Sequence, residues 1–297
     1  MTTTTYVMGI DGGGTHVRVV ICTPELKVIA ESDGKSVNPN AVGKDSAARE
    51  LRRVIREALL KAGIVPNAIA AVGAGIAGTQ ALQGWLEETL VPIFPKARIM
   101  TALDLEIALM GAFGERNGVI IVSGTGSAAY GINSAGETAL VGGWGYLLGD
   151  EGSGYWIGLQ LLRDYTRMLD GVSKPRGWHV ALASQIGGGT REYLVEWRYS
   201  RAQVSDVAAL ATIALENEHE PICRTILDSA AGHLGKSALA VIEQLRLPAD
   251  RIAFAGGLLS TVTPLSERLR AFLKLPTFPA ARHSASIGAV LLAREQV

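Results

Sequence analysis

The chain has 297 residues, of which 48% are hydrophobic and 19% are charged. This length exceeds the roughly 250 residues that usually share one core, so we expect two domains, and the composition argues against intrinsic disorder. Lys plus Arg and Asp plus Glu are equal at 28 each, so no overall charge favours nucleic acid or an anionic membrane as a partner.

The cysteines and the N-terminus narrow the class of protein further. Cys22 and Cys223 lie far apart, which fits neither a disulfide scaffold nor a thiolate metal site with paired spacing. The first residues, MTTTTYVMGID, lack a basic region followed by an apolar run, and no stretch approaches the ~20 apolar residues that span a bilayer. We therefore expect a soluble cytoplasmic protein.

The first predicted motif is a hairpin whose turn is rich in glycine. An apolar strand over 6–10 is followed by the turn DGGGT at 11–15 and by a second strand over 16–22. Consecutive glycine N–H groups and the Thr15 hydroxyl could hold a phosphate, and Asp11 could face a cation or a water. An ordinary tight hairpin is the alternative. The turn is not a Walker loop, because the next element is a strand and no Gly-Lys-Ser/Thr follows.

A third strand over 27–32 leads into a predicted loop over 33–43. Asn38 and Asn40 lie in this loop, and asparagines in turns usually hydrogen-bond their own backbone. A helix over 45–62 follows, with Leu, Val and Ile at helical spacing.

The next predicted elements are a buried strand over 69–74, a Gly-Ala-Gly turn at 73–75, a helix over 79–91 and a strand over 97–101. Asp104 comes just past the last of these strands, where open α/β sheets place their ligands. It could equally be the N-cap of the helix predicted over 105–113, and the two roles are compatible.

The pattern then restarts about a hundred residues after the first hairpin. A strand over 119–122, a glycine-threonine turn over 123–127 and a returning strand over 128–132 repeat the N-terminal arrangement. We interpret this as an internal duplication of the fold, which would supply one phosphate-binding hairpin from each of two domains.

The segment GGWGYLLGDEGSGYWIG at 142–158 is the richest in glycine, and it also carries Trp144, Asp150 and Glu151. Glycine removes side chains where the backbone must approach a ligand, and the aromatic and acidic residues could form the wall of a small-molecule pocket. A glycine-rich surface loop is the alternative. The helix predicted from Ser153 to 169 could present free N–H donors at its N-terminus.

The rest of the chain is mostly helical in prediction. Helices are expected over 180–185, 191–197, 203–215 and 222–245, with Trp178 and Trp197 serving packing.

A strand over 251–255 ends in two glycines, and Ser260 and Thr261 are predicted to open the next helix. Thr277 and Phe278 would end the sheet, and a closing helix over 285–295 would hold Gly288 in a close-packed position.

Four segments together carry a family resemblance: IDGGGTHVRV at 10–19, VSGTGSAAYG at 122–131, the glycine-rich 142–158 segment and FAGG at 254–257. They resemble the sugar-kinase, actin and heat-shock ATPase superfamily, and within it the BadF/BadG/BcrA/BcrD group and its N-acetylglucosamine kinases. The resemblance implies an α/β fold of two ribonuclease H-like, actin-like ATPase domains around a central cleft. The first domain would be 1–115 completed by a C-terminal helix over 285–297, and the second 116–284.

The resemblance also implies an activity. The chain would use ATP and Mg²⁺ to phosphorylate the 6-hydroxyl of an amino sugar, N-acetyl-D-glucosamine first, with glucosamine or N-acetylmuramic acid as alternatives. It would be a cytoplasmic homodimer with no nucleic-acid or membrane partner. The same group includes activators that hold an iron–sulfur cluster through cysteines, but neither cysteine here is predicted in a cluster-binding loop. A non-enzymatic nucleotide-binding scaffold is the remaining alternative.

Carried over position by position, the resemblance assigns residues to three roles. Asp104 matches the catalytic aspartate, which would accept the proton of the sugar hydroxyl. The nucleotide and its metal would contact Asp11, Gly12, Gly13, Gly14, Thr15, Gly124, Thr125, Gly126, Gly256, Gly257 and Ser260, with Asp11 beside the metal. The sugar would contact Asn38, Pro39, Asp104, Ser127, Ala128, Gly143, Trp144, Gly145 and Asp150. One departure is His16, where many bacterial relatives carry Lys.

Overall fold

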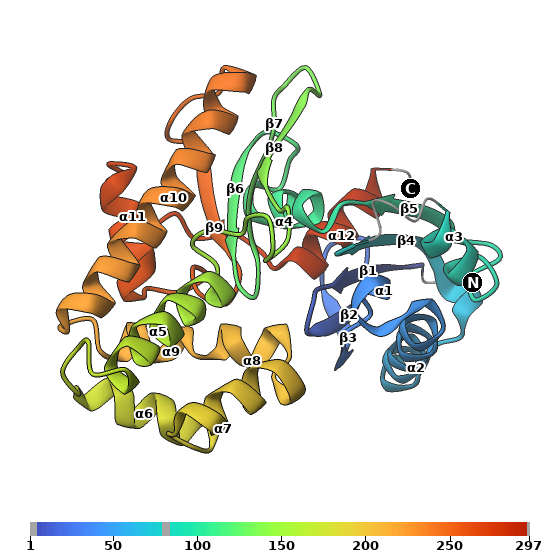
Figure 1. The fold of residues 1–297 in the computed structure, drawn as a ribbon. Coiled ribbons are helices and arrows are strands. Elements are labelled where there is room, and N and C mark those ends of the chain that lie inside the picture. The colour runs from blue at the N-terminus through green and yellow to red at the C-terminus, as the bar shows by residue number, and fades with distance from the viewer. Residues whose placement is uncertain (1–4, 79–83, 296–297) are drawn as a thin grey trace. The chain divides into compact units, whose positions relative to one another are not determined.

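The computed structural model describes residues 5–78 and 84–295, and the chain divides into two compact units, each built around a sheet (Figure 1). The first unit comprises Met1–Gly118, Ile132–Gly136 and Ala281–Val297, and the second comprises Val119–Gly131 and Glu137–Ala280. The mixture of helices and strands in both units confirms the predicted α/β class.

The sheet of the first unit has the order β3-β2-β1-β4-β5. Its strands are β1 (Tyr6–Gly12), β2 (His16–Cys22), β3 (Val28–Lys35), β4 (Ile69–Ile76) and β5 (Arg98–Ala102). The first three strands pair antiparallel, whereas β4 and β5 add in parallel to β1. Alternate residues of β1 enter different cores: Met8 and Ile10 face helix α2 (Lys44–Ala62), while Val7 faces helix α12 (Ala285–Arg294).

Helix α2 covers one face of this sheet through Leu51, Val54 and Ile55, which recur at helical spacing. The helix ends where Gly63 adopts a left-handed conformation and donates to the carbonyl groups of Leu59 and Leu60.

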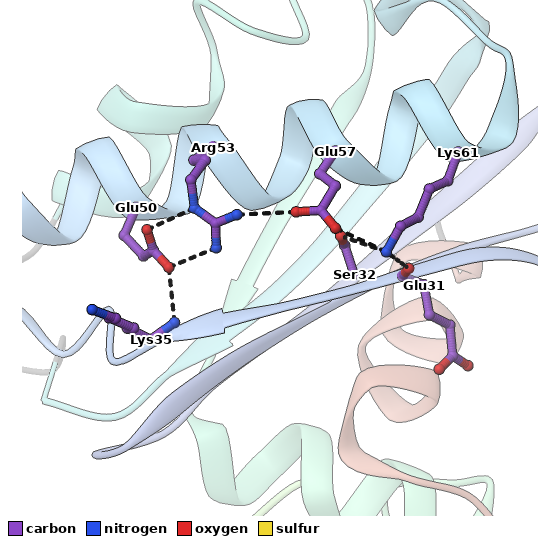
Figure 2. A network of polar contacts seen from close by, with 7 residues as sticks. All are labelled: Glu31, Ser32, Lys35, Glu50, Arg53, Glu57 and Lys61. Atoms are coloured by element: carbon purple, nitrogen blue, oxygen red, sulfur yellow. Dashed lines mark hydrogen bonds and ion pairs between the residues drawn. The ribbon is translucent and has the colours of Figure 1, made fainter.

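A row of charged residues on α2 forms ion pairs along the helix and hydrogen bonds to the backbone of strand β3 (Figure 2). Arg53 bonds both Glu50 and Glu57, and Glu50 also accepts the backbone N–H of Lys35 at 2.8 Å. Lys61 pairs with Glu57 and donates to the carbonyl oxygen of Glu31. Because most of these side chains are partly exposed, the ion pairs contribute little, and the apolar face of α2 supplies most of the stability.

Helix α12 covers the opposite face of the sheet at unusually short range. A Cβ atom at Gly9 would overlap the carbonyl oxygen of Ser286, and one at Gly73 would overlap that of Ala289. Gly288 of α12 itself approaches Ile107 so closely that only glycine fits, which confirms its predicted close packing. The Gly-Ala-Gly turn predicted at 73–75 is therefore wrong: these residues continue β4, and the glycine at 73 is required by the helix above it.

The other elements of the first unit are short. They are α1 (Pro39–Val42), η1 (Pro66–Ala68), α3 (Trp85–Leu90) and α4 (Asp104–Phe113). Of the helix predicted over 79–91, residues 79–83 lie outside the described residues, and α3 covers part of the remainder. The predicted loop over 33–43 is corrected, since β3 extends to Lys35 and α1 forms within it.

The sheet of the second unit has the order β8-β7-β6-β9. Its strands are β6 (Gly118–Ser123), β7 (Ser127–Ile132), β8 (Thr138–Gly142) and β9 (Ile252–Ala255). This order repeats β3-β2-β1-β4 of the first sheet, with β9 parallel to β6 as β4 is to β1. The internal duplication is therefore confirmed at the level of strand order, although β8 has too short an apolar pattern to be foreseen.

Helices make up most of the second unit (Figure 1). They are α5 (Gly154–Leu169), α6 (Gly177–Ile186), α7 (Arg191–Glu196), the π-helical turn η2 (Trp197–Arg201), α8 (Val204–Ala209), α9 (Ala211–Glu216), α10 (Pro221–Leu245) and α11 (Pro264–Phe272). None of the described helices is long and apolar enough to cross a bilayer. Trp178 and Trp197 are buried in the core of this unit, as predicted.

Three predictions for the second unit are wrong. The helix predicted over 203–215 is interrupted at Leu210, between α8 and α9. The helix predicted to open at Ser260 begins at Pro264, because Thr263 caps it by accepting the N–H of Ser266 and Pro264 occupies the first turn. The sheet ends with a bridge between Phe254 and Ala280 and does not end at Thr277 and Phe278.

Candidate functional site

In the first unit, the carboxyl ends of three parallel strands lie side by side. Asp11 of β1 is opposite Gly75 of β4, which in turn is opposite Ala102 of β5. Asp104 follows β5 as the first residue of α4, and its carboxylate accepts backbone N–H groups of Leu105 and of Asp104 itself. The N-cap position belongs to Leu103, so the N-cap alternative for Asp104 is wrong by one residue.

Gly75 is a residue of this site that the sequence prediction missed. A Cβ atom there would lie 2.8 Å from the side chain of Ile107 and 3.0 Å from the carbonyl oxygen of Leu103. The absence of a side chain lets the start of α4 lie against β4, which brings Asp104 to the edge of the sheet that also carries Asp11. A glycine near the end of a predicted strand was the only indication in the sequence.

Asp11 and Asp104 form a pair of neighbouring carboxylates, both with a raised pKa. Burial and the neighbouring charge of Asp104 raise the pKa of Asp11 to about 6, and Arg18 offsets only part of this because it bonds Asp33 at 2.8 Å. Burial also raises the pKa of Asp104. Two partly buried acids at one sheet edge favour a bound cation or a shared proton.

The first glycine turn lies next to Asp11. Gly13 donates its N–H to the carbonyl oxygen of His16 at 2.8 Å, which closes the hairpin, and Ala77 donates to Gly12 at 2.7 Å. Gly14, Thr15 and His16 are exposed at the tip of the turn. The Thr15 hydroxyl lies 3.0 Å from Nδ1 of His16.

Asn38 and Pro39 lie at the start of α1 in the same unit. The side-chain oxygen of Asn38 accepts the N–H of Asn40 at 2.9 Å, so Asn38 caps the helix and the predicted bond to its own backbone is confirmed. Asn40 donates to the carbonyl oxygen of Gly78 at 2.8 Å, and Pro39 is buried. The side-chain amide nitrogen of Asn38 has no protein partner among the described residues.

In the second unit, the glycine turn at 124–126 is held by helix α5. Gly124 donates to the carbonyl oxygen of Gly126 at 2.9 Å, while Gly154 and Tyr155 donate to the carbonyl oxygens of Gly124 and Thr125 at 2.7 and 3.3 Å. The third N–H of the helix, from Trp156, goes to the capping hydroxyl of Ser153. The prediction of free N–H donors at this helix start is wrong, because these donors hold the turn.

Asp150 connects the turn to the glycine-rich segment. It is buried, has a left-handed backbone with φ of 62°, and its carboxylate accepts the N–H groups of Ser127 and Gly145. Burial raises the pKa of Asp150, and these two donors oppose the rise. A Cβ atom at Gly126 would lie 2.7 Å from the Oδ2 atom of Asp150, so the carboxylate fills the space beside that glycine.

The remaining residues predicted on the sugar side gather around Asp150. Gly143 donates to the carbonyl oxygen of Ser127 at 3.0 Å, and a Cβ atom at Gly143 would lie 3.5 Å from that of Ala128. Trp144 has an exposed fraction of 74%, which leaves its ring available to a ligand.

The end of β9 meets the same turn. Gly256 has φ of 84°, and a Cβ atom there would overlap the carbonyl oxygen of Ser123, which also accepts the N–H of Leu258 at 3.0 Å. A Cβ atom at Gly124 would lie 3.8 Å from the nitrogen of Gly257. Ser260 is exposed in the loop that follows and bonds back to Gly256 at 2.9 Å. Ser123, which the prediction missed, is buried and donates to the carbonyl oxygen of Gly152 at 2.8 Å.

Comparison with known proteins finds relatives that match most of this chain. The chain is 31% identical over 307 residues to an N-acetylmuramic acid/N-acetylglucosamine kinase of Clostridium acetobutylicum, covering 98% of this chain and 99% of the relative. It is 28% identical over 280 residues to an N-acetyl-D-glucosamine kinase of Dictyostelium discoideum, covering 88% of each. A crystal structure of a proposed N-acetylglucosamine kinase from Chromobacterium violaceum superposes with a TM-score of 0.82 at 28% identity, covering 98% of this chain and 99% of that one.

The match to a family model extends over almost the whole chain. Residues 8–293 match the model described as the BadF/BadG/BcrA/BcrD ATPase family. This range includes both glycine turns, Asp11 and Asp104 of the first unit and the glycine-rich segment of the second. The chain belongs to the BadF/BadG/BcrA/BcrD ATPase family.

Proposed function

We propose that the chain is an ATP-dependent kinase that phosphorylates the 6-hydroxyl of an amino sugar, with N-acetyl-D-glucosamine as its preferred substrate. Membership of an ATPase family supports the use of ATP. The names of the bacterial and Dictyostelium relatives, which match most of their length to this chain, support an amino sugar as the acceptor.

One observation carries the proposal: two carboxylates with raised pKa values, Asp11 and Asp104, lie at the carboxyl edge of the first sheet. Phosphoryl transfer requires positioning and charge stabilisation more than covalent chemistry. Asp104 would accept the proton of the sugar 6-hydroxyl. The hydroxyl oxygen would then bond to the γ-phosphorus of ATP, while the bond between that phosphorus and the ADP oxygen breaks. The raised pKa of Asp104 makes it a stronger base for this step.

Asp11 would hold the magnesium ion that accompanies ATP. The fit rests on charge: the carboxylate of Asp104 raises the pKa of Asp11, and Arg18 offsets only part of this rise. No group of three or more acidic, histidine or cysteine side chains that could hold a metal ion occurs within the described ranges, so water would complete the coordination, as is usual for Mg²⁺. When bound, the ion neutralises charge on the transferring phosphoryl group.

The two glycine turns would bind the nucleotide, and the glycine-rich segment would bind the sugar. Gly12 to Thr15, Gly124 to Gly126, and Gly256 and Gly257 with Ser260 would hold the nucleotide. Asp150 keeps acceptor capacity beyond its two backbone donors and would bind sugar hydroxyls, beside Trp144 as an apolar wall.

Two other functions are disfavoured by particular residues. Cys22 and Cys223 are both buried free cysteines, and burial raises the pKa of each to about 11, which is unsuited to thiolate ligation of an iron–sulfur cluster. A nucleotide-binding scaffold would need no exposed Trp144 beside Asp150.

Assays of ADP release across several sugars test the proposal. We expect N-acetylglucosamine to stimulate turnover more than glucosamine, N-acetylmuramic acid or glucose. If only glucosamine or only N-acetylmuramic acid stimulated turnover, that sugar would be the acceptor in place of N-acetylglucosamine. ATP hydrolysis that no sugar stimulates would contradict the proposal that the chain is a sugar kinase.

Asp104→Asn tests the catalytic assignment. This change keeps the shape of the side chain and removes the base, so we expect kcat to fall by about 10²–10⁴-fold while calorimetry shows unchanged sugar binding. Asp45→Asn is the matched control, because Asp45 also lies in the first turn of a helix but is exposed. Near-normal turnover by Asp104→Asn would remove the residue from this role.

The resemblance further implies a cytoplasmic homodimer, and both properties remain predictions. Light scattering coupled to size-exclusion chromatography measures the oligomeric state directly, with a mass of 31.3 kDa expected for a monomer.

A further inference from the structure

Tyr155, the second residue of α5, connects three separate segments of the second unit. Its backbone N–H donates to the carbonyl oxygen of Thr125 in the glycine turn. Its ring packs against that of Tyr146, with centroids 4.7 Å apart and planes inclined by 53°. Its hydroxyl oxygen accepts a hydrogen bond of 2.9 Å from Arg198. A buried residue with these contacts can transmit the position of one segment to another.

Arg198 lies on the π-helical turn η2, a type of turn that is rare and often occurs at functional sites. It is half-buried, and in the described parts of the chain it has no carboxylate partner. Arg201, on the same turn, is different: it pairs with Glu196 and lies over the ring of Tyr193. A half-buried guanidinium that bonds a phenol hydroxyl, and no carboxylate among the described residues, is better explained by orientation of that phenol than by charge pairing.

Tyr146 links the ring of Tyr155 to the glycine-rich segment, to which it belongs. It follows Gly145, whose N–H binds the carboxylate of Asp150. Gly145 also accepts the N–H groups of Leu148 and Gly149, at 3.1 and 2.9 Å. The ring of Tyr146 therefore fixes the backbone next to Gly145, the residue whose hydrogen bonds shape this loop.

We propose that Arg198 and Tyr155 are positioning residues that hold Tyr146, and with it residues 142–149, in the conformation that binds the sugar. This inference rests on the proposed kinase function. Neither side chain needs to touch the sugar. Because the N–H of Tyr155 still reaches Thr125 when its hydroxyl is lost, the pair acts on the sugar side and leaves the nucleotide turn in place.

Steady-state kinetics of Arg198→Met and Tyr155→Phe test the inference. Each variant keeps most of its packing volume and loses the hydrogen bond, so we expect the KM for the sugar to rise about 10-fold in either, with the KM for ATP within about twofold of wild type. The double variant should be no worse than the single ones, because one interaction is removed in all three. Arg198→Lys should recover part of the loss.

Arg201→Met is the matched control, since it changes an arginine of the same turn whose contacts lie away from Tyr155. We expect wild-type KM values from it. Equal effects of Arg198→Met and Arg201→Met, or an unchanged sugar KM in Arg198→Met and Tyr155→Phe, would overturn the inference.

Hydrogen–deuterium exchange without any sugar separates this inference from the proposed function. The amides of Gly143, Gly145, Leu148 and Gly149 are hydrogen-bonded, so peptides covering 142–149 report the order of the loop. We expect faster exchange there in Arg198→Met and Tyr155→Phe and no change in Arg201→Met. Unchanged exchange in the first two would reject the positioning role even in an active kinase, and faster exchange would support it even if the wild type phosphorylated no amino sugar.

Discussion

The two glycine turns of this protein follow equivalent strands of duplicated sheets, yet they are supported very differently. The tip of the first turn is exposed, and a Cβ atom at Gly14 would meet no other atom within 4 Å. The second turn is held by helix α5, by the end of β9 and by Asp150. The second turn is therefore fixed by contacts within the protein, whereas the first has room to change its conformation.

The aspartates beside the two turns differ in the same way. Asp150 receives two backbone N–H groups, which compensate part of its burial. Asp11 faces a second carboxylate instead. Backbone donors of the protein thus stabilise the charge of Asp150, whereas the neighbouring carboxylate destabilises the charge of Asp11.

We expect the largest loss of stability when the contact between the end of β9 and the second turn is disrupted. Gly256→Ala places a side chain on a residue with φ of 84° and against the carbonyl oxygen of Ser123. We expect a loss of about 3 kcal/mol or more in the free energy of unfolding. Urea denaturation measures it, and Gly257→Ala is the matched control, because a Cβ there meets no atom within 4 Å. Equal losses in both variants would contradict the prediction.

The pH dependence of stability tests the contrast between the aspartates. The pKa of Asp11 is raised to about 6, so its ionised form destabilises the folded state increasingly as the pH rises from about 4 through 6. Asp11→Asn should therefore stabilise the ligand-free protein by roughly 2–3 kcal/mol above pH 7, and the gain should vanish near pH 4.

Asp150→Asn is the counterpart: the pKa of Asp150 is also raised, but two backbone donors oppose the rise, so we expect a smaller gain over the same pH range. Thermal melting of both variants across pH 4–8, without nucleotide or metal, makes the comparison. A pH-independent effect of Asp11→Asn would show that its charge is not the cause.

We expect the smallest change in stability when a glycine in either turn, Gly126 or Gly14, is replaced by alanine. Gly126→Ala would place a Cβ 2.7 Å from Oδ2 of Asp150 and displace that carboxylate, which costs about 1–2 kcal/mol. Gly14→Ala should change stability by less than about 0.5 kcal/mol, since its Cβ meets nothing. Urea denaturation of the ligand-free variants compares them, and the reverse order would mean that the first turn is the more constrained.

Local patterns were sufficient to predict the strands on either side of both turns, because a glycine-threonine turn between apolar runs depends on neighbouring residues. The same reasoning placed Gly73 in a turn, since the helix that requires this glycine comes more than two hundred residues later in the chain. The role of the N–H groups of Gly154 and Tyr155 could not be read either, because their acceptors lie on a distant turn. Asp104 was found by its place after a strand, but its coupling to Asp11 depends on Gly75 and on the register of three strands.

The packing of α12 on β1 and β4 has a consequence for synthesis on the ribosome. The second unit has all its strands and helices once residue 280 has emerged, but Val7 and Ala71 of the first sheet stay uncovered until Val290 and Ala293 follow. The unit that begins first is therefore completed last, which reverses the usual N-to-C order of cotranslational folding. A nascent chain stalled before α12 would expose this apolar surface to chaperones or to other nascent chains.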